Sequence, residues 1–120
     1  MNDKLNSELS SIVHPSGPIT FLFTDIEGST ELLKQLGDEY AIVLADQRRI
    51  LREVISVWNG QEVDTQGDSF FISFSRAAES VAAAIEIQRS LAEHAWPEDV
   101  DVRVRMGLHT GSPWLQKRAM

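Results

Sequence analysis

The sequence predicts an α+β domain in which two split βαβ units share one antiparallel sheet with helices on one face. Three observations support this fold class: the predicted elements follow the order β-α-β-β-α-β, an apolar strand precedes the first helical segment, and a hairpin separates the two long helical segments. Right-handed crossovers then place the first and third strands side by side at the centre of the sheet. This is the ferredoxin-like arrangement, and 120 residues with 42% hydrophobic content suit one such domain.

The first half of the chain begins with a polar segment over residues 1–17, which we expect to be a flexible lead-in because it lacks the basic-then-apolar layout of a signal peptide. Residues 19–25 predict a central strand, because they are apolar on both faces except at the threonines. A short helix is expected from Ser29 to about Leu36, and a longer one from Glu39 to Trp58. The longer helix should bury a stripe made of Tyr40, Leu44, Leu51, Val54, Ile55 and Trp58.

The second half begins after Asn59-Gly60 with two extended runs, residues 61–66 and 68–74, which we interpret as a hairpin hinged at Gln66-Gly67. A second long helix is expected from Ser75 or Arg76 to about Ala95, where Trp96-Pro97 closes it. Its predicted inward residues are Ala77, Val81, Ala84, Ile85, Leu91 and Ala92. Residues 100–109 alternate apolar and polar side chains and predict a half-buried strand, and residues 114–120 are expected to form an irregular tail.

Composition excludes several classes of function. The net charge of −7 and the scattered lysines and arginines argue against a nucleic-acid partner. The chain has no cysteine, which excludes disulfides and thiolate sites. No apolar run approaches the ~20 residues of a membrane span, so we expect no membrane contact from this chain and a cytoplasmic location.

Two aspartates are the main candidates for chemistry. Asp25 ends the first strand and Asp68 begins the third, so antiparallel pairing should bring both carboxylates to the same edge of the sheet. Such a pair suits Mg²⁺ or Mn²⁺, and a backbone carbonyl near Ile26 could add a ligand. The amides from Glu27 to Thr30, at a helix start, could bind phosphate oxygens. The pattern therefore predicts a metal-dependent triphosphate site.

Simpler interpretations compete with this one. A lone aspartate at a strand end is more often a turn or capping residue, and only the predicted adjacency of the two favours metal binding. Glu27 is expected to be a solvated turn residue rather than a metal ligand. The run Asp25-Ile26-Glu27-Gly28-Ser29 is superficially similar to the nucleophile loop of haloacid-dehalogenase-type phosphatases. That match is poor, because the hairpin after Gly60 breaks the alternating order of a doubly wound fold.

Three sequence blocks together resemble the class III adenylate/guanylate cyclase catalytic domains. They are Phe21–Thr30, Thr65–Phe71 and Met106–Gly111, and the resemblance covers residues 18–113. It implies a domain that converts ATP or GTP to the 3′,5′-cyclic nucleotide and pyrophosphate with two metal ions, as a dimer with its site at the interface. It also implies that the metal ligands are Asp25, Asp68 and the carbonyl of Ile26, and that the triphosphate lies over Glu27, Gly28, Ser29 and Thr30.

The chain departs from the family pattern in two places. Asp64 stands where the family commonly has a lysine that helps to bind the purine, so base selection should differ from the usual. The family domain also continues into strands that carry a second base-binding residue and a catalytic Asn/Arg pair, whereas residues 114–120 offer only Lys117 and Arg118 as cations. We therefore expect an incomplete cyclase domain, weak or inactive alone and with no certain catalytic residue; the alternative is a catalytically dead module that senses nucleotide or dimerises.

Overall fold

The computed structural model describes residues 17–111, which form one four-stranded antiparallel sheet with the strand order β2-β3-β1-β4. The predicted element order and the central pairing of the first and third strands are confirmed. The expected tail and nearly all of the expected lead-in lie outside the described residues. In chain order the elements are β1 (Ile19–Ile26), α2 (Ser29–Leu36), the 3-10 helix η1 (Gly37–Glu39), α3 (Tyr40–Val57), β2 (Gln61–Gln66), β3 (Ser69–Phe74), α4 (Ala77–Glu93), the 3-10 helix η2 (Pro97–Asp99) and β4 (Val104–Gly111).

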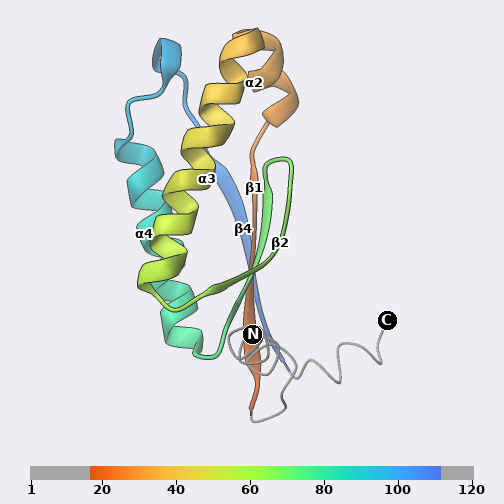
Figure 1. The fold of residues 1–120 in the computed structure, drawn as a ribbon, viewed down its shortest axis with the longest axis vertical. Coiled ribbons are helices and arrows are strands. Elements are labelled where there is room, and N and C mark those ends of the chain that lie inside the picture. The colour runs from red at the N-terminus through yellow and green to blue at the C-terminus, as the bar shows by residue number, and fades with distance from the viewer. Residues whose placement is uncertain (1–16, 112–120) are drawn as a thin grey trace, which may run out of the picture.

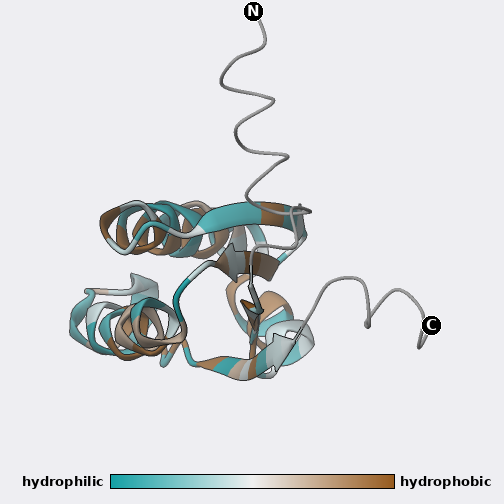
Figure 2. Cartoon of the chain, turned by 90° about the horizontal axis from the view of Figure 1, so that it is seen from below, coloured by the Kyte–Doolittle hydropathy of each residue, from teal (hydrophilic) through white to brown (hydrophobic). Residues whose placement is uncertain are grey.

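The two long helices form one layer and the sheet forms the other. Figure 1 shows α3 and α4 side by side on one face of the sheet, with α2 beyond the end of β1. Helix α4 packs on β1, β3 and β4, while α3 packs on β2 and on α4. Both hydrophobic and hydrophilic residues occur along these helices (Figure 2), as expected for helices with one buried side. Among the described residues, no helix is both long and apolar enough to cross a membrane.

The central strand β1 separates two different environments. Leu22 and Thr24 point toward the helices and are fully buried, whereas Phe23 points to the opposite face and is 45% exposed. On that open face Phe21 stacks on Phe71 of β3, with ring centroids 5.0 Å apart. The predicted two-sided apolar character of this strand therefore has two causes, since one side fills the core and the other forms an aromatic surface.

The buried sides of the helices differ partly from prediction. In α3 the predicted Leu51, Val54 and Ile55 are buried, and Val43, Gln47 and Ile50 join them. In α4 the predicted Leu91 is buried, but most of the predicted stripe is wrong: Val81 and Ile85 are about half exposed, and Ser80, Ala83 and Ile87 are buried instead. Small residues allow α4 to approach the sheet closely, and the Ser80 hydroxyl is satisfied by donating to the Ala77 carbonyl at 2.7 Å.

The last strand begins later than predicted. Residues 97–99 form η2, in which Glu98 and Asp99 have positive φ angles, and β4 starts only at Val104 instead of Val100. The chain needs these residues to reverse direction after α4, which ends at Glu93, two residues before the expected Ala95. From there β4 pairs with the whole of β1, ending with Gly111 opposite Ile19.

Candidate functional site

Asp68 lies directly against the end of β1. It occupies the turn between β2 and β3, and its Oδ2 accepts the backbone N–H of Ile26 at 3.0 Å. The two residues are 42 positions apart in sequence. The central pairing of β1 with β3 therefore brings Asp68 to the end of β1 that carries Asp25, where its carboxylate contacts the residue after Asp25.

Asp25 is engaged by an arginine from the neighbouring strand. In the β1–β4 register Asp25 stands opposite Arg105, whose Nε and Nη2 donate to Asp25 Oδ1 and Oδ2, each at 2.9 Å. The Asp25 side chain is 22% exposed and that of Arg105 is 66% exposed. Hydrogen bonding to Asp25 raises the pKa of the Arg105 guanidinium above its ordinary value, with further contributions from the charges of Glu27 and Asp68. Both aspartates therefore influence the same cationic group.

The turn after β1 presents the start of a helix. Gly28 has φ +64°, a left-handed conformation that glycine adopts at little cost, and α2 follows from Ser29. The first N–H groups of a helix lack partners within it and attract anions. The amide of Glu27, however, already donates to the carbonyl of Arg103 at 2.7 Å. The phosphate-binding amides predicted over Glu27 to Thr30 thus reduce to those that follow Glu27.

Helix α3 holds the turn that carries Asp68. Arg48 Nη2 donates to the carbonyl of Gly67 at 2.6 Å, and Gln47 Nε2 approaches the carbonyl of Asp68 at 3.4 Å. Gln47 is fully buried. Neither residue is predicted from the sequence, because the predicted inward side of this helix contains only apolar and aromatic residues. The available signal was the spacing of Gln47, which lies four residues after Val43 and four before Leu51.

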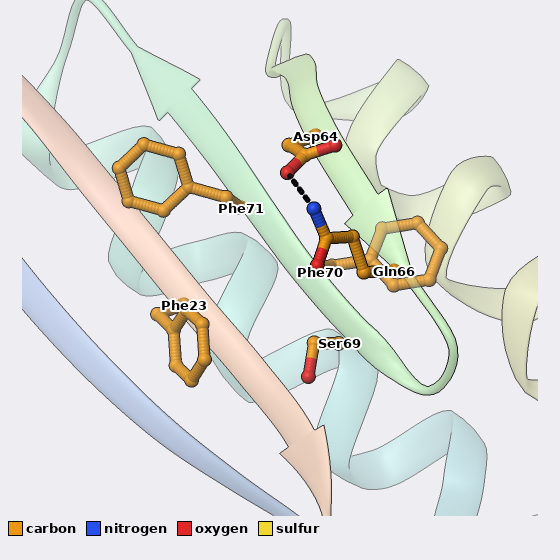
Figure 3. A pocket seen from close by; sticks show the side chains of 6 residues that line it. All are labelled: Phe23, Asp64, Gln66, Ser69, Phe70 and Phe71. Carbon is orange, nitrogen blue, oxygen red and sulfur yellow. Dashed lines mark hydrogen bonds between the residues drawn. The ribbon is translucent and has the colours of Figure 1, made fainter.

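A hollow of about 290 Å³ lies on the open face of the sheet, between β1 and the β2–β3 hairpin. Figure 3 shows Phe23, Phe71, Ser69, Asp64 and Gln66 around it, while Phe70 points to the other side of the sheet. The carboxylate of Asp64 accepts the N–H of Thr65 at 2.9 Å and Gln66 Nε2 at 3.2 Å. Two aromatic rings and a fixed carboxylate therefore line one concavity.

The donor set suits a hard divalent cation in part. Carboxylate oxygens of Asp25 and Asp68 and the Ile26 carbonyl are ligands of the kind that Mg²⁺ and Mn²⁺ prefer, with water or phosphate completing the coordination. Within residues 17–111 no group of three or more His, Cys, Asp or Glu side chains forms a metal cluster. Arg105 already places a positive charge on Asp25. The residues fit a divalent cation provided that Arg105 moves off this carboxylate.

Comparison with known proteins identifies the family. Residues 12–116 match the family model of the adenylate and guanylate cyclase catalytic domain. Because this match covers most of the chain, the chain belongs to the adenylate and guanylate cyclase catalytic domain family. The resemblance seen in the three sequence blocks is thereby confirmed.

Individual relatives are consistent with this assignment. The chain is 28% identical over 121 residues to an adenylate cyclase of Lachancea kluyveri, covering 85% of this chain and 7% of that protein. It is 40% identical over 79 residues to receptor-type adenylate cyclase B of Leishmania donovani, covering 66% and 6% respectively. An uncharacterized protein of Mycobacterium tuberculosis is 36% identical over 105 residues, covering 85% and 34%. The chain thus spans only a small part of the curated relatives that it matches.

Solved structures share the fold. An adenylate cyclase of Trypanosoma brucei, solved in its monomeric state, superimposes with a TM-score of 0.79 at 27% identity, covering 82% of this chain and 57% of that one. The guanylate cyclase domain of RhGC from Catenaria anguillulae, in complex with GTP, superimposes with a TM-score of 0.71 at 18% identity, covering 78% and 56%. The antiparallel sheet excludes the doubly wound fold that the phosphatase interpretation requires.

Proposed function

We propose that residues 18–113 form part of a nucleotide cyclase domain that converts a purine nucleoside triphosphate, ATP or GTP, to the 3′,5′-cyclic nucleotide and pyrophosphate in cytoplasmic signalling. The observation that carries the proposal is that the Asp68 carboxylate accepts the amide of Ile26, the residue that follows Asp25, next to the start of α2 in a chain of the cyclase family. Metal carboxylates and helix amides together suit a triphosphate.

In this proposal Asp25, Asp68 and the Ile26 carbonyl hold Mg²⁺ or Mn²⁺, two ions in all. When bound, the ions supply activation of the attacking hydroxyl and stabilisation of the leaving phosphate. The amides of Gly28, Ser29 and Thr30 orient the phosphates at the positive end of α2. Arg105 leaves Asp25 and donates instead to phosphate oxygens, which match its planar fork as well as a carboxylate does.

The hollow lined by Phe23, Phe71 and Asp64 is proposed to bind the purine. Phe23 and Phe71 offer ring faces for stacking, and Asp64 offers a carboxylate that only accepts hydrogen bonds. Guanine presents two adjacent donors, its N1–H and its 2-amino group, whereas adenine presents a donor beside the acceptor N1. The carboxylate at this position therefore favours GTP over ATP, and Asp64→Lys should shift the preference toward ATP.

The proposal includes a homodimer, since the open face of the sheet carries the exposed ring of Phe23 and the stacked rings of Phe21 and Phe71. Mixing two variants with impaired activity on GTP tests whether two copies build one site. If Asp64 of one copy serves the aspartates of the other, a mixture of the Asp25→Ala and Asp64→Ala chains should recover part of the activity. Separate sites within each copy would give no recovery.

The deciding experiment measures product formation by the full chain with Mn²⁺ and GTP or ATP, before and after Asp25→Ala. We expect cyclic nucleotide from the unchanged chain and a loss of at least ~10²-fold in the variant. A second candidate function is a module that binds nucleotide or dimerises without catalysis, which the engagement of Asp25 by Arg105 favours. Binding of nucleotide without product would support that module, and product unaffected by Asp25→Ala would refute the proposed site.

A further inference from the structure

We infer that Arg48 of α3, supported by Gln47, is a positioning residue that holds the Asp68 carboxylate at the end of β1. The functional meaning of this inference rests on the proposed function, but the contacts themselves do not. Arg48 and Gln47 are consecutive in α3, and they approach the carbonyls of the consecutive residues Gly67 and Asp68, at 2.6 and 3.4 Å. One turn of helix thus contacts both peptide units that precede β3.

The turn depends on such support. Gly67 has φ +58°, so the chain reverses there in a left-handed conformation. The pairing of β2 with β3 ends at Gln66 and Ser69, so it does not include Gly67 or Asp68. Gln47 is fully buried, and its Nε2 donates to the Asp68 carbonyl, since a buried donor is costly unless it is hydrogen bonded. On the other side of the turn, the Asp68 carboxylate accepts the Ile26 amide at 3.0 Å. The backbone of this segment is therefore held by α3 while its side chain is held by β1.

The charges around the turn agree with this geometry. Burial raises the pKa of Tyr40 above its usual 10.0, and the nearby charge of Asp68 raises it further while Arg48 lowers it. Tyr40 thus lies close enough to both Asp68 and Arg48 for their charges to act on it. Freed from Arg48, the Gly67–Asp68 segment could rotate and carry the carboxylate away from Ile26 and Asp25.

Positioning and charge predict opposite effects on cation binding, which makes the inference testable. Arg48 carries a positive charge near the proposed cation, so its removal would tighten binding if charge alone mattered. Loss of a group that orients a ligand typically weakens metal affinity by ~10- to 100-fold. Arg48→Met should therefore weaken binding if Arg48 positions Asp68, and strengthen it if Arg48 acts only as a nearby charge.

The test titrates the full chain with Mn²⁺ alone and follows free Mn²⁺ by electron paramagnetic resonance. We expect Arg48→Met to weaken binding about tenfold and Arg48→Lys, which keeps a donor at this position, to recover most of it. Arg49→Met is the matched control, since Arg49 is the next residue of α3 and pairs with Glu53 on the exposed side. It loses the same charge and should bind Mn²⁺ as the unchanged chain does.

A second readout needs no metal. Amide hydrogen exchange at Ile26 reports whether Asp68 still accepts that N–H, and we expect exchange to accelerate at least about tenfold in Arg48→Met but not in Arg49→Met. Equal exchange rates in the two variants, or unchanged or tighter Mn²⁺ binding by Arg48→Met, would overturn the inference. Faster exchange at Ile26 in Arg48→Met, in a chain that binds no Mn²⁺, would support the positioning role and refute the proposed function instead.

Discussion

Arg105 of β4 covers Asp25 of β1 through two hydrogen bonds of 2.9 Å, so the carboxylate predicted to bind a metal already binds a cation of the protein itself. The two residues are 80 positions apart in sequence and directly opposite in the strand register. In the proposed cyclase the metal ion and the Arg105 guanidinium compete for the carboxylate oxygens of Asp25, so Arg105 should weaken metal binding.

Arg105→Gln should have opposite effects on the affinities for Mn²⁺ and for GTP. Without the guanidinium, Asp25 is released and a nearby positive charge is lost, so Mn²⁺ should bind about fivefold more tightly. The triphosphate of GTP should bind more weakly, because a bidentate phosphate donor is gone. Calorimetry with each ligand measures both effects. Arg103→Gln is the control, since Arg103 pairs with Asp101 on the surface; equal Mn²⁺ affinity in the two variants would contradict the competition.

Gly60→Ala should destabilise the domain by about 1–3 kcal/mol through overpacking. A Cβ at this position would lie 2.7 and 2.8 Å from ring carbons of Phe74 and 3.0 Å from Ile55. Both neighbours are buried and have little room to move. Urea denaturation measures the change. Gly107→Ala is a suitable control because nothing lies within 4 Å of its Cβ position, and the prediction fails if the two variants unfold alike.

The ion pair between Arg52 and Glu62 should make the free energy of unfolding depend on pH. Hydrogen bonds from Arg52, at 2.9 and 3.0 Å, lower the pKa of Glu62 below its usual 4.5, and Thr65 contributes to the same shift. The folded state therefore binds this proton less readily than the unfolded state. The stabilisation is fully present above pH 4.5 and is lost as the pH falls through the lower folded value.

Glu62→Gln should remove this part of the pH dependence and cost about 0.5 kcal/mol at pH 7, the usual size for an exposed pair. Free energies of unfolding at pH 3 to 7 provide the measurement. We expect the two proteins to differ at neutral pH and to converge at the acid end. A constant difference across the range would show that the charge of Glu62 plays no part.

Glu98→Asn should stabilise the domain, and relief of backbone strain should contribute about 1 kcal/mol of this gain. Glu98 has φ 53° and ψ 27°, a left-handed conformation that asparagine tolerates better than glutamate. Its side chain also raises the pKa of Glu39, mainly through a hydrogen bond and then through charge, so the contact becomes less favourable as the pH rises through the folded pKa of Glu39. The gain should therefore be larger at pH 7 than at pH 4.

Glu98→Gln is the control for this change, because it removes the charge but keeps a long side chain in the left-handed conformation. Thermal unfolding of both variants at the two pH values separates the backbone effect from the charge effect. If the two variants are equally stable at pH 4, the backbone contributes nothing. If neither gain changes with pH, Glu39 and Glu98 do not interact in solution.

The predictable part of the site followed from topology. Apolar periodicity located the strands, the turn residues separated them, and the crossover rule placed β1 beside β3, which put Asp68 at the end of β1 that carries Asp25. The inward side of α4 was not predictable in the same way. With alanines on all sides, the helix has no clear apolar stripe, and close packing against the sheet selected Ser80 and Ala83 over Val81 and Ile85.

Local sequence patterns and general rules of chain connection were enough to predict the order of the elements and the central pairing of β1 with β3. These patterns could not predict that Arg105 covers Asp25 or that Arg48 and Gln47 hold the turn of Asp68, contacts that form only in the folded chain. Those contacts depend on strand register and on the rotation of α3 over the sheet. Both are set by the packing of side chains that are distant in sequence. A shift of the strand register by one residue would place a different residue opposite Asp25, and a rotation of α3 would turn other side chains toward the turn of Asp68.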